Sequence, residues 1–455
     1  MLSRRFSDAP AGLDPYSTSS TVSRDWPRRA GMLVLVLILV TTGSYIREKA
    51  ADEYSEVDWL VIAQVGLSLA GGYLGTTLIR RSSLGGFGAR VLAVYLLAVV
   101  ASAPFSSYAM LVAGYWILLA GTSLLCLGLV SSSVTEDSLR DIETLILATL
   151  SFMLLKDTLI DAFYFQPQVE RLEEQGIEMY RFGMGSSSSN SMGLLAAVAF
   201  WMSFKTPSER GAGSVLRLLW RGLFVAVVLL TRTRIALAAL LWSGVLRWWF
   251  VHRQQRSSRP HTVLVAMPCI IVSFVLFLTI GWLWRVPLIA GGLDLVNRGE
   301  DSDTMMSVTG RTDVWPYALK RILDGPISIV FGHGYGASRS VLNENNSNAS
   351  FFAYHAHNTF LEVLLSTGVL GALPFIVLVV YSLTWLVRFS WLLQSFSLGF
   401  ALRAATVVSA ILNSTMTESE LAIKIGPALV IYLFYVLSLD RQPAFLRASQ
   451  LRSGH

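Results

Sequence analysis

The chain is poor in charged residues and in cysteine, and each shortage excludes a class of protein. Only 15% of its 455 residues are charged against 53% apolar ones, and the mean hydropathy of +0.54 excludes an ordinary soluble domain. Its two cysteines, Cys126 and Cys269, fall in apolar runs, so no disulfide framework is indicated. Walker, Rossmann, HExxH and GxSxG patterns are absent, and no internal repeat is visible, which disfavours an inverted-repeat transporter.

What the chain has instead is a series of long apolar runs. Runs of about 20 apolar residues suit membrane-spanning helices, because a helix satisfies its own backbone hydrogen bonds in lipid. We therefore predict an all-α, polytopic integral membrane protein with about 12 transmembrane helices. The expected spans are 31–46, 57–79, 89–103, 108–130, 142–160, 191–204, 214–230, 235–250, 262–284, 368–387, 395–412 and 421–438.

Arginine and lysine gather in both ends of the chain and in alternate loops. The positive-inside rule then places both termini in the cytoplasm, and no cleavable signal peptide is expected. The net charge of +6 follows from this topology and gives no indication of nucleic-acid binding. The expected regions are a disordered cytoplasmic tail at 1–30, transmembrane helices one to nine in 31–284, a large periplasmic loop domain with short helices at 285–357, C-terminal transmembrane helices in 358–440 and a cytoplasmic tail at 441–455.

Two of the six histidines stand where the large loop meets an apolar helix. His355 and His357 are two residues apart, so we expect their side chains to face opposite sides. Asn358 suits the N-cap of a helix that begins at Thr359, and Glu362 suits its first turn. We expect His357, beside the cap, to act as a general base near neutral pH. The alternative is an interfacial histidine bonded to backbone.

Two arginine-bearing segments are candidates for binding an anion. Arg232 and Arg234 lie between two apolar runs at an external membrane edge, where arginine is uncommon, and Arg234 is nearer the following helix. Arg311 directly precedes a predicted surface helix, and a guanidinium fork matches a phosphate group. The alternatives are a snorkelling pair that marks a helix end and a surface pair of Arg311 with an aspartate.

The large loop is predicted to contain an amphipathic helix at 313–323 that rests on the membrane surface. Residues 332–336, which include three glycines, are expected to form a flexible turn. The acidic residues of the loop lack metal-ligand spacing, so neither a metal nor another cofactor is expected. Asp313 would cap the surface helix, and its apolar stripe would consist of Trp315, Leu319 and Ile322.

Arg403 interrupts one of the expected spans. It would pair with Glu418 or Glu420 at a helix end, or line the same cavity as the other arginines. Structural and functional roles stay equally open for it.

Two arginine sites and a histidine, all placed on the external face, suit one kind of reaction. A lipid pyrophosphate is a good leaving group once cations stabilise its charge. The hydroxyl of a second sugar that attacks the sugar carbon bound to this pyrophosphate needs a base to take up its proton.

Three motifs together resemble the O-antigen ligase and polysaccharide polymerase superfamily. They are TRTRIALAAL at 231–240, GRTDVW followed by GHGYG within 309–336, and HAHNTFLEVLLSTGVLG at 355–371, with a weaker echo at 413–419. The resemblance covers roughly residues 190–390. It implies an inverting glycosyltransferase of the bacterial inner membrane, with a GT-C-like helical fold, that uses undecaprenyl-pyrophosphate-linked glycan donors without a metal.

The same resemblance implies roles for individual residues. Arg234 and Arg311 would bind the pyrophosphate and His357 would activate the acceptor hydroxyl, while Arg232 leaves the choice between the two neighbouring arginines open. Supporting residues would be His355, Asn358, Arg403 and Glu418.

The acceptor separates the branches of the superfamily. It is a second lipid-linked repeat unit for a polymerase, lipid A-core for a ligase, and a protein for the third branch. The motifs are closer to those of exopolysaccharide polymerases, for which a chain-length regulator is a further possible partner. A polytopic lipid-glycan transporter or flippase is the rival from another class; it would spread polar residues through many spans.

Overall fold

The computed structural model describes most of the chain outside its ends and the longest loops. The described residues are 19–43, 59–79, 86–133, 135–163, 168–172, 177–181, 189–204, 214–231, 233–255, 311–343, 355–389, 392–393, 396–415, 419, 421–422 and 425–440.

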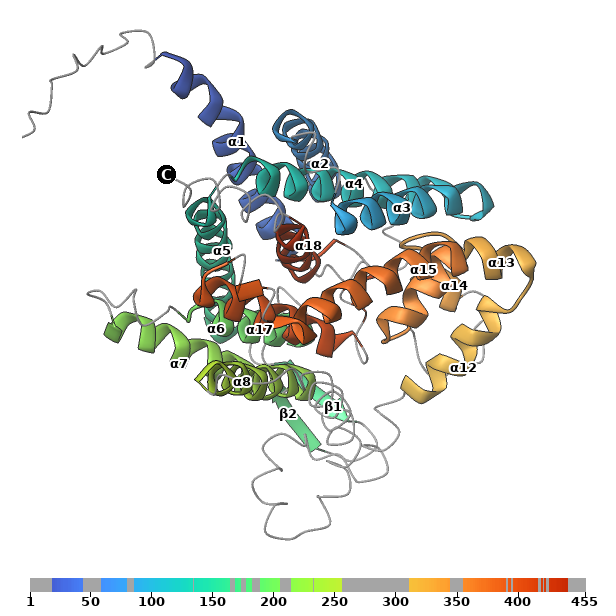
Figure 1. Ribbon diagram of the computed structural model, residues 1–455. Coiled ribbons are helices and arrows are strands. Elements are labelled where there is room, and N and C mark those ends of the chain that lie inside the picture. The colour runs from blue at the N-terminus through green and yellow to red at the C-terminus, as the bar shows by residue number, and fades with distance from the viewer. Residues whose placement is uncertain are drawn as a thin grey trace, which may run out of the picture.

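Helices dominate the described chain, as its composition predicts (Figure 1). The N-terminal part contains α1 (Ser19–Gly43), α2 (Trp59–Leu78), α3 (Phe87–Ser102) with a short 3₁₀ turn (Ala103–Phe105), α4 (Ala109–Ser132), α5 (Glu136–Phe163), α6 (Ser189–Met202), α7 (Ser214–Leu230) and α8 (Arg234–Gln255). The C-terminal part contains α12 (Arg311–Ile322), α13 (Pro326–Phe331), α14 (Ser338–Asn343), α15 (Thr359–Val387), α17 (Leu398–Ser414) and α18 (Pro427–Leu439).

Two local features depart from the predicted organisation. A β-hairpin of β1 (Gln168–Leu172) and β2 (Ile177–Arg181), with Gln168 opposite Arg181, lies in the loop after α5 and was not predicted, while the rest of the described chain is helical as the all-α prediction has it. Helix α1 begins at Ser19, inside the segment expected to be disordered. Its polar end is held in place because Arg28 donates to the carbonyl of Ser138 at 2.9 Å.

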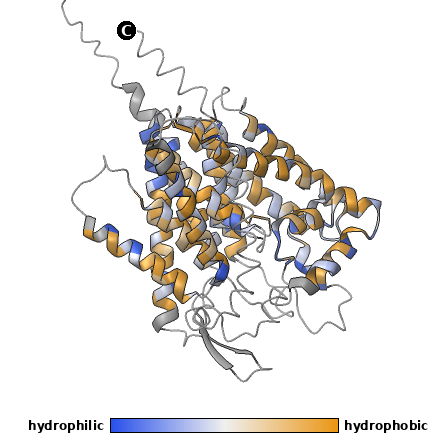
Figure 2. Ribbon diagram, turned by 60° about the horizontal axis from the view of Figure 1, so that its bottom comes forward, coloured by the Kyte–Doolittle hydropathy of each residue, from blue (hydrophilic) through white to orange (hydrophobic). Residues whose placement is uncertain are grey.

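Within the described residues, six helices are long and apolar enough to cross a membrane, which indicates a multi-pass membrane protein. They are Trp26–Gly43, Leu60–Leu78, Phe87–Phe105, Ala109–Ser132, Arg234–Val251 and Thr359–Val387, and three shorter apolar helices are Ser189–Met202, Leu398–Ser414 and Pro427–Leu439. Apolar residues colour most of these helices in Figure 2. Twelve spans remain a prediction, since the span expected at 262–284 lies outside the described residues.

Close packing of small residues brings α2 and α4 together. A Cβ on Gly121 would lie 2.0 Å from the carbonyl oxygen of Ser68, so the two backbones touch there. Cys126 of α4 is buried as a small apolar residue, as predicted, whereas Cys269 lies outside the described part. Helix α18 is buried along its whole length, contacts α1, α3, α4, α6 and α17, and lies in the interior of the bundle (Figure 1).

Helix α15 is kinked at Gly368, and the kink receives the glycine-rich turn at 332–336. Gly368 has a φ of +59°, and the backbone N–H groups of His333 and Gly334 donate to the carbonyls of Leu365 and Ser366 at 2.9 and 2.8 Å. The side chain of Tyr335 is fully buried in this turn. The turn is therefore packed against α15, and the expectation of a flexible segment is wrong. The hydrogen bonds that fix the turn come from a helix about 30 residues later in the chain, so local composition does not reveal them.

Candidate active site

The segment His355–Asn358 forms a tight turn just before α15. His357 has a φ of +50°, the left-handed region that only a few per cent of non-glycine residues adopt. This backbone reversal brings the imidazoles of His355 and His357 to a centroid separation of 3.9 Å. The expectation that the two side chains face opposite sides is therefore wrong, because it assumed a regular helix or strand.

A hydrogen bond within the turn orders His355. The backbone N–H of His357 donates to Nδ1 of His355 at 3.1 Å. Because that nitrogen is the acceptor, a neutral His355 carries its ring proton on Nε2. The two rings therefore form one unit, with His355 positioned by the backbone of His357.

The start of α15 is capped as the sequence predicts. The side-chain oxygen of Asn358 accepts from the backbone N–H groups of Phe360 and Leu361 at 3.0 and 3.1 Å. This cap satisfies two of the amides that a helix start leaves without intrahelical partners. It also places His357 directly before the positive end of the helix dipole.

The peptide groups on either side of Ala356 are held by two side chains, an arrangement we call the Ala356 clamp. Glu362, fully buried in the first turn of α15, accepts the N–H of Ala356 at 2.8 Å through Oε2. The indole Nε1 of Trp315 in α12 donates to the carbonyl of Ala356 at 3.0 Å. Ala356 itself is fully buried, so the clamp determines the path of the chain immediately before His357.

Helix α12 starts earlier and packs differently from the prediction. Its first residue is Arg311, so Asp313 lies inside the helix and not at the N-cap position. Its buried residues are Val314, Ala318 and Ile322, which form a core with α14, Ala356 and Leu365, whereas Leu319 is 44% exposed. The expected stripe of Trp315, Leu319 and Ile322 on the membrane surface is therefore wrong. Neighbouring loop helices supply an apolar surface, and α12 turns its Val314 face toward them.

The position of Arg311 follows from this helix. Arg311 is the first residue of α12 and precedes Trp315 by four residues. Because Trp315 bonds to Ala356, the start of α12 is anchored near the histidine turn.

Arg234 is the first residue of α8, at a tightly packed turn between α7 and α8. The hydroxyls of Thr231 and Thr233 are fully buried and lie 3.1 Å apart in a hydrogen bond. A Cβ on Gly193 of α6 would lie 2.3 Å from the Thr233 hydroxyl, so α6 closes over this turn. The N-terminal end of a helix, at which Arg234 stands, favours a bound anion through its backbone N–H groups and its dipole.

Helices α8 and α17 pack side by side, and their contacts with Phe204 show that they run antiparallel. Near the start of α17, Arg403 donates to the carbonyl of Phe204 at 3.2 Å. Near the end of α8, the guanidinium of Arg247 lies 4.8 Å from the centre of the Phe204 ring. Phe204 therefore joins the start of one helix to the end of the other.

The candidate site lies at the other end of the α8–α17 helix pair, where α8 begins and α17 ends. From Arg247 back to Arg234 and from Arg403 on to Thr415, the helices rise about 20 Å and about 18 Å. At that level the carbonyl of Thr415 accepts the N–H of Thr359, the first residue of α15, at 2.9 Å. Arg234 and the His357 turn consequently lie at the same end of the bundle.

Arg403 does not take part in this site. It makes a two-point ion pair with Glu143 of α5, with nitrogen–oxygen distances of 2.9 and 2.8 Å, and both side chains are buried. The expectation that it pairs with Glu418 or Glu420, or lines the arginine cavity, is wrong because α5 supplies the carboxylate from another part of the bundle. Glu418, Glu420 and Arg232 lie outside the described residues.

Sequence reasoning missed three contributions to the site. Trp315 was expected only as a surface residue, Glu362 only as a helix-dipole residue, and Thr415 belongs to the weak motif at 413–419. The signal for Glu362 was present, since an acidic residue in an otherwise apolar helix needs a buried partner. The partner itself is a backbone N–H six residues earlier, which composition does not reveal.

Tyr335 lies in the turn beside α15 and is not suited to act as a base. Burial, followed by the neighbouring Tyr95, Tyr115 and Glu362, raises the pKa of its phenol well above its usual range. It therefore stays protonated at neutral pH.

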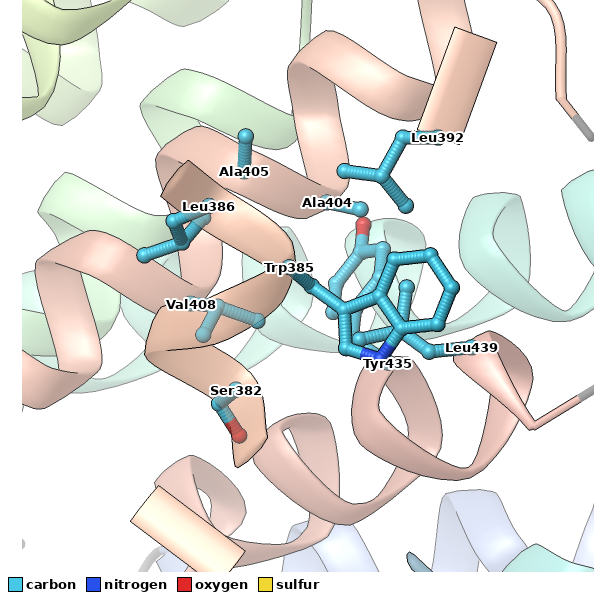
Figure 3. Close-up of a pocket in the computed structure, with 9 residues that line it drawn as sticks. All are labelled: Ser382, Trp385, Leu386, Leu392, Ala404, Ala405, Val408, Tyr435 and Leu439. Carbon is cyan, nitrogen blue, oxygen red and sulfur yellow. The ribbon is translucent and has the colours of Figure 1, made fainter. Parts of the chain in front are cut away.

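A crevice visible in Figure 3 lies between α15, α17 and α18 and is separate from the histidine turn. Trp385 and Ser382, which line it, belong to the end of α15 farthest from His357. Its walls are mostly apolar, and its two hydroxyls, of Ser382 and Tyr435, are hydrogen-bonded to Tyr432 and Glu143. Within the described residues, no three His, Cys, Asp or Glu side chains group as metal ligands.

Comparison with known proteins adds a family. Residues 222–376 match a family model described as O-antigen ligase, and a search of curated proteins gave no match. The matched range contains Arg234, the start of α12, the histidine turn and the kink at Gly368. This match at residues 222–376 supports the O-antigen ligase and polysaccharide polymerase superfamily that the three sequence motifs resemble.

Proposed function

We propose that this protein is an inverting, metal-independent membrane glycosyltransferase. It polymerises undecaprenyl-pyrophosphate-linked glycan repeat units at the periplasmic face of the bacterial inner membrane. The observation that supports this most is the placement of Arg234 and His357 at one end of the bundle, although 123 residues separate them. An anion-binding residue and a base at the same end are the two groups that the reaction requires.

The chemistry divides between these groups. An acceptor hydroxyl oxygen bonds to the anomeric carbon of the donor while the bond from that carbon to the pyrophosphate oxygen breaks. The electron pair leaves with undecaprenyl pyrophosphate, and His357 takes the hydroxyl proton. Attack opposite the leaving group inverts the anomeric centre.

The pyrophosphate is assigned to Arg234 and Arg311, with Arg232 as the alternative to Arg234. Each guanidinium offers a planar fork that forms two hydrogen bonds to phosphate oxygens. The first turns of α8 and α12, at which Arg234 and Arg311 stand, also present backbone N–H groups and a positive dipole end. Both contributions stabilise charge that grows on the leaving group.

His357 is proposed as the base and His355 and Asn358 as its supports. Left-handed backbone at a histidine costs about 1–2 kcal/mol, and such strain is found where the surrounding structure enforces it at a functional site. Here the Ala356 clamp and the Asn358 cap provide that enforcement. The arrangement suits a residue whose orientation matters for proton transfer.

The topology is proposed as predicted from the basic loops. It has about twelve spans of the GT-C kind, both termini cytoplasmic, and a periplasmic loop domain at 285–357 between the bundle at 31–284 and the helices at 358–440. Under this topology the shared end of α8 and α15 faces the periplasm, where lipid-linked repeat units are joined.

A ligase that transfers glycan to lipid A-core is the second candidate, because the matched family model is described as O-antigen ligase. Both reactions share the donor and differ in the hydroxyl that attacks. The clamp and arginine geometry is compatible with either acceptor.

Purified protein incubated with lipid-linked repeat units tests the proposal. Growth of a lipid-linked ladder is expected, with His357→Ala losing turnover while donor binding persists. Transfer that requires added lipid A-core would select the ligase instead. Wild-type turnover by His357→Ala would remove the histidine from the mechanism. Activity should also persist in a chelator, and loss restored by a divalent ion would contradict a metal-free reaction.

A further inference from the structure

The end of the bundle away from His357 carries a cluster of arginines around one aromatic ring. Phe204 follows α6, and the guanidinium carbons of Arg221 and Arg247 lie 4.0 and 4.8 Å from its ring centre. Arg221 also donates to Ser203, at 3.1 Å to the hydroxyl and 2.9 Å to the carbonyl. Arg403 donates to the Phe204 carbonyl. Three guanidinium groups from α7, α8 and α17 thus meet at the end of α6.

The charges in this cluster are not balanced by carboxylates of the described chain. Glu143 pairs with Arg403 and also accepts a hydrogen bond from Tyr435. Arg221 contacts a hydroxyl, a carbonyl and a ring, and Arg247 contacts the ring, but neither makes an ion pair among the described residues. Two positive charges therefore exceed the carboxylates within the described cluster.

Part of the Arg247 guanidinium group is buried inside the protein. Its Nη1 atom is buried and has no hydrogen-bond partner within the described part of the chain. The positive charges of Arg403 and Arg221 lie close enough to act on it. A buried arginine nitrogen beside like charges is favourable only with an anion or another acceptor nearby.

The surface beside the cluster is apolar and faces outward. Leu218 and Leu219 of α7, one turn before Arg221, are 68% and 65% exposed, and Trp248, next to Arg247, is 61% exposed. Exposed leucine side chains on a membrane-spanning helix are suited to contact lipid, and tryptophan is enriched at membrane interfaces. A phosphate-bearing lipid headgroup can approach the two arginines from this side.

We propose that Arg221 and Arg247 form a site for a phosphate group, supplied by an anionic phospholipid headgroup or by free phosphate. Guanidinium groups bind phosphate through paired charge-assisted hydrogen bonds. The site is separate from the glycosyl-transfer site, because it lies at the opposite ends of α8 and α17. Its occupant links α6, α7 and α8 at the cytoplasmic end expected from the basic loops. The proposal does not depend on which glycan the protein transfers.

Thermal unfolding of purified protein in neutral detergent tests it. The unfolding temperatures of wild type, Arg247→Gln and Arg90→Gln are measured at matched ionic strength. Each protein is tested with phosphatidylglycerol, with phosphatidylcholine and with inorganic phosphate. Arg90 is an exposed arginine near the start of α3, where the N–H groups of Gly88 and Ala89 bond to Asp440 at the end of α18, and it serves as the control. Phosphatidylglycerol should raise the unfolding temperature of wild type and Arg90→Gln, with binding to Arg247→Gln weaker by about tenfold or more.

Comparison of phosphatidylglycerol with inorganic phosphate identifies the source of the bound phosphate group. Stabilisation by phosphatidylglycerol alone supports a lipid headgroup, and equal stabilisation by inorganic phosphate supports a free ion. Equal stabilisation of Arg247→Gln and wild type, or none of either by any phosphate compound, overturns the site. If Arg247→Gln does not fold, Arg221→Gln and the conservative Arg247→Lys are compared by native mass spectrometry of co-purified phosphatidylglycerol. Undiminished lipid retention by Arg221→Gln would equally overturn it.

Discussion

Replacing Glu362 tests whether the Ala356 clamp positions the proposed base. Glu362→Met keeps an unbranched side chain of similar length in the helix but removes the acceptor for the buried N–H of Ala356. Glu362→Gln is the matched variant, because its amide oxygen still accepts that hydrogen bond. The pair separates hydrogen bonding from simple occupation of the space.

The expected loss of kcat follows from two opposing free energies, the backbone strain at His357 and the hydrogen bonds to Ala356. Left-handed backbone at His357 costs about 1–2 kcal/mol, and two net hydrogen bonds to the peptide groups of Ala356 contribute about 1–3 kcal/mol. Leaving the Ala356 N–H buried without an acceptor costs about 1–3 kcal/mol, enough for the turn to leave its observed conformation. Because about 1.4 kcal/mol corresponds to a tenfold change, kcat should fall by about 5- to 150-fold.

The assay is the initial rate of ladder growth at several donor concentrations. Glu362→Met should lower kcat with little change in the donor KM, since the arginines are untouched, and Glu362→Gln should stay close to wild type. Thermal unfolding of each variant shows that the fold persists. Wild-type kcat in Glu362→Met would refute the positioning role, and an equal loss in Glu362→Gln would assign the effect to charge rather than to the hydrogen bond.

Three further predictions concern binding and stability. Arg311→Lys should lower kcat/KM for the donor by about tenfold, since an ammonium does not reproduce the guanidinium fork, and unchanged kinetics would indicate a surface role. Gly368→Ala should lower the unfolding temperature, because Gly368 has a φ of +59° and a Cβ there would lie 2.3 Å from a carbonyl oxygen of α13. Gly114→Ala is the control: its added Cβ meets no atom within 4 Å, so this variant should unfold at the wild-type temperature. Arg403→Met should destabilise by about 3–5 kcal/mol by leaving Glu143 buried without its partner, and adding Glu143→Gln should recover part of the loss in chemical denaturation; a single variant as stable as wild type would contradict a buried pair.

Much of the site was predictable where the physics is local. The cap at Asn358 and the first turn at Thr359 follow from side-chain preferences within a few residues. Helix α7 has the bounds expected from its apolar run, because continuous hydrophobicity between polar residues limits a span. These features depend on neighbours in sequence, so a sequence is sufficient for them.

The failures have a common cause in contacts between distant segments. Arg403 pairs with Glu143, 260 residues away, and Trp315 bonds to Ala356 across 41 residues. Local rules predicted a nearer partner for the first and a membrane surface for the second. Only packing shows which of several acceptors a buried donor finds.

Composition and apolar periodicity by themselves determined that this protein lies in a membrane as a bundle of helices, and the motifs indicated the superfamily that the family match at residues 222–376 supports. Hydrophobic length and capping act along one segment, which is why these conclusions needed no coordinates. The tertiary structure decided that Arg234 and the histidine turn share one end of the bundle, that both imidazoles meet, and that Arg403 belongs to the other end. Those outcomes depend on the direction in which helices pack and on one left-handed residue, and neither is encoded in the spacing of residue types.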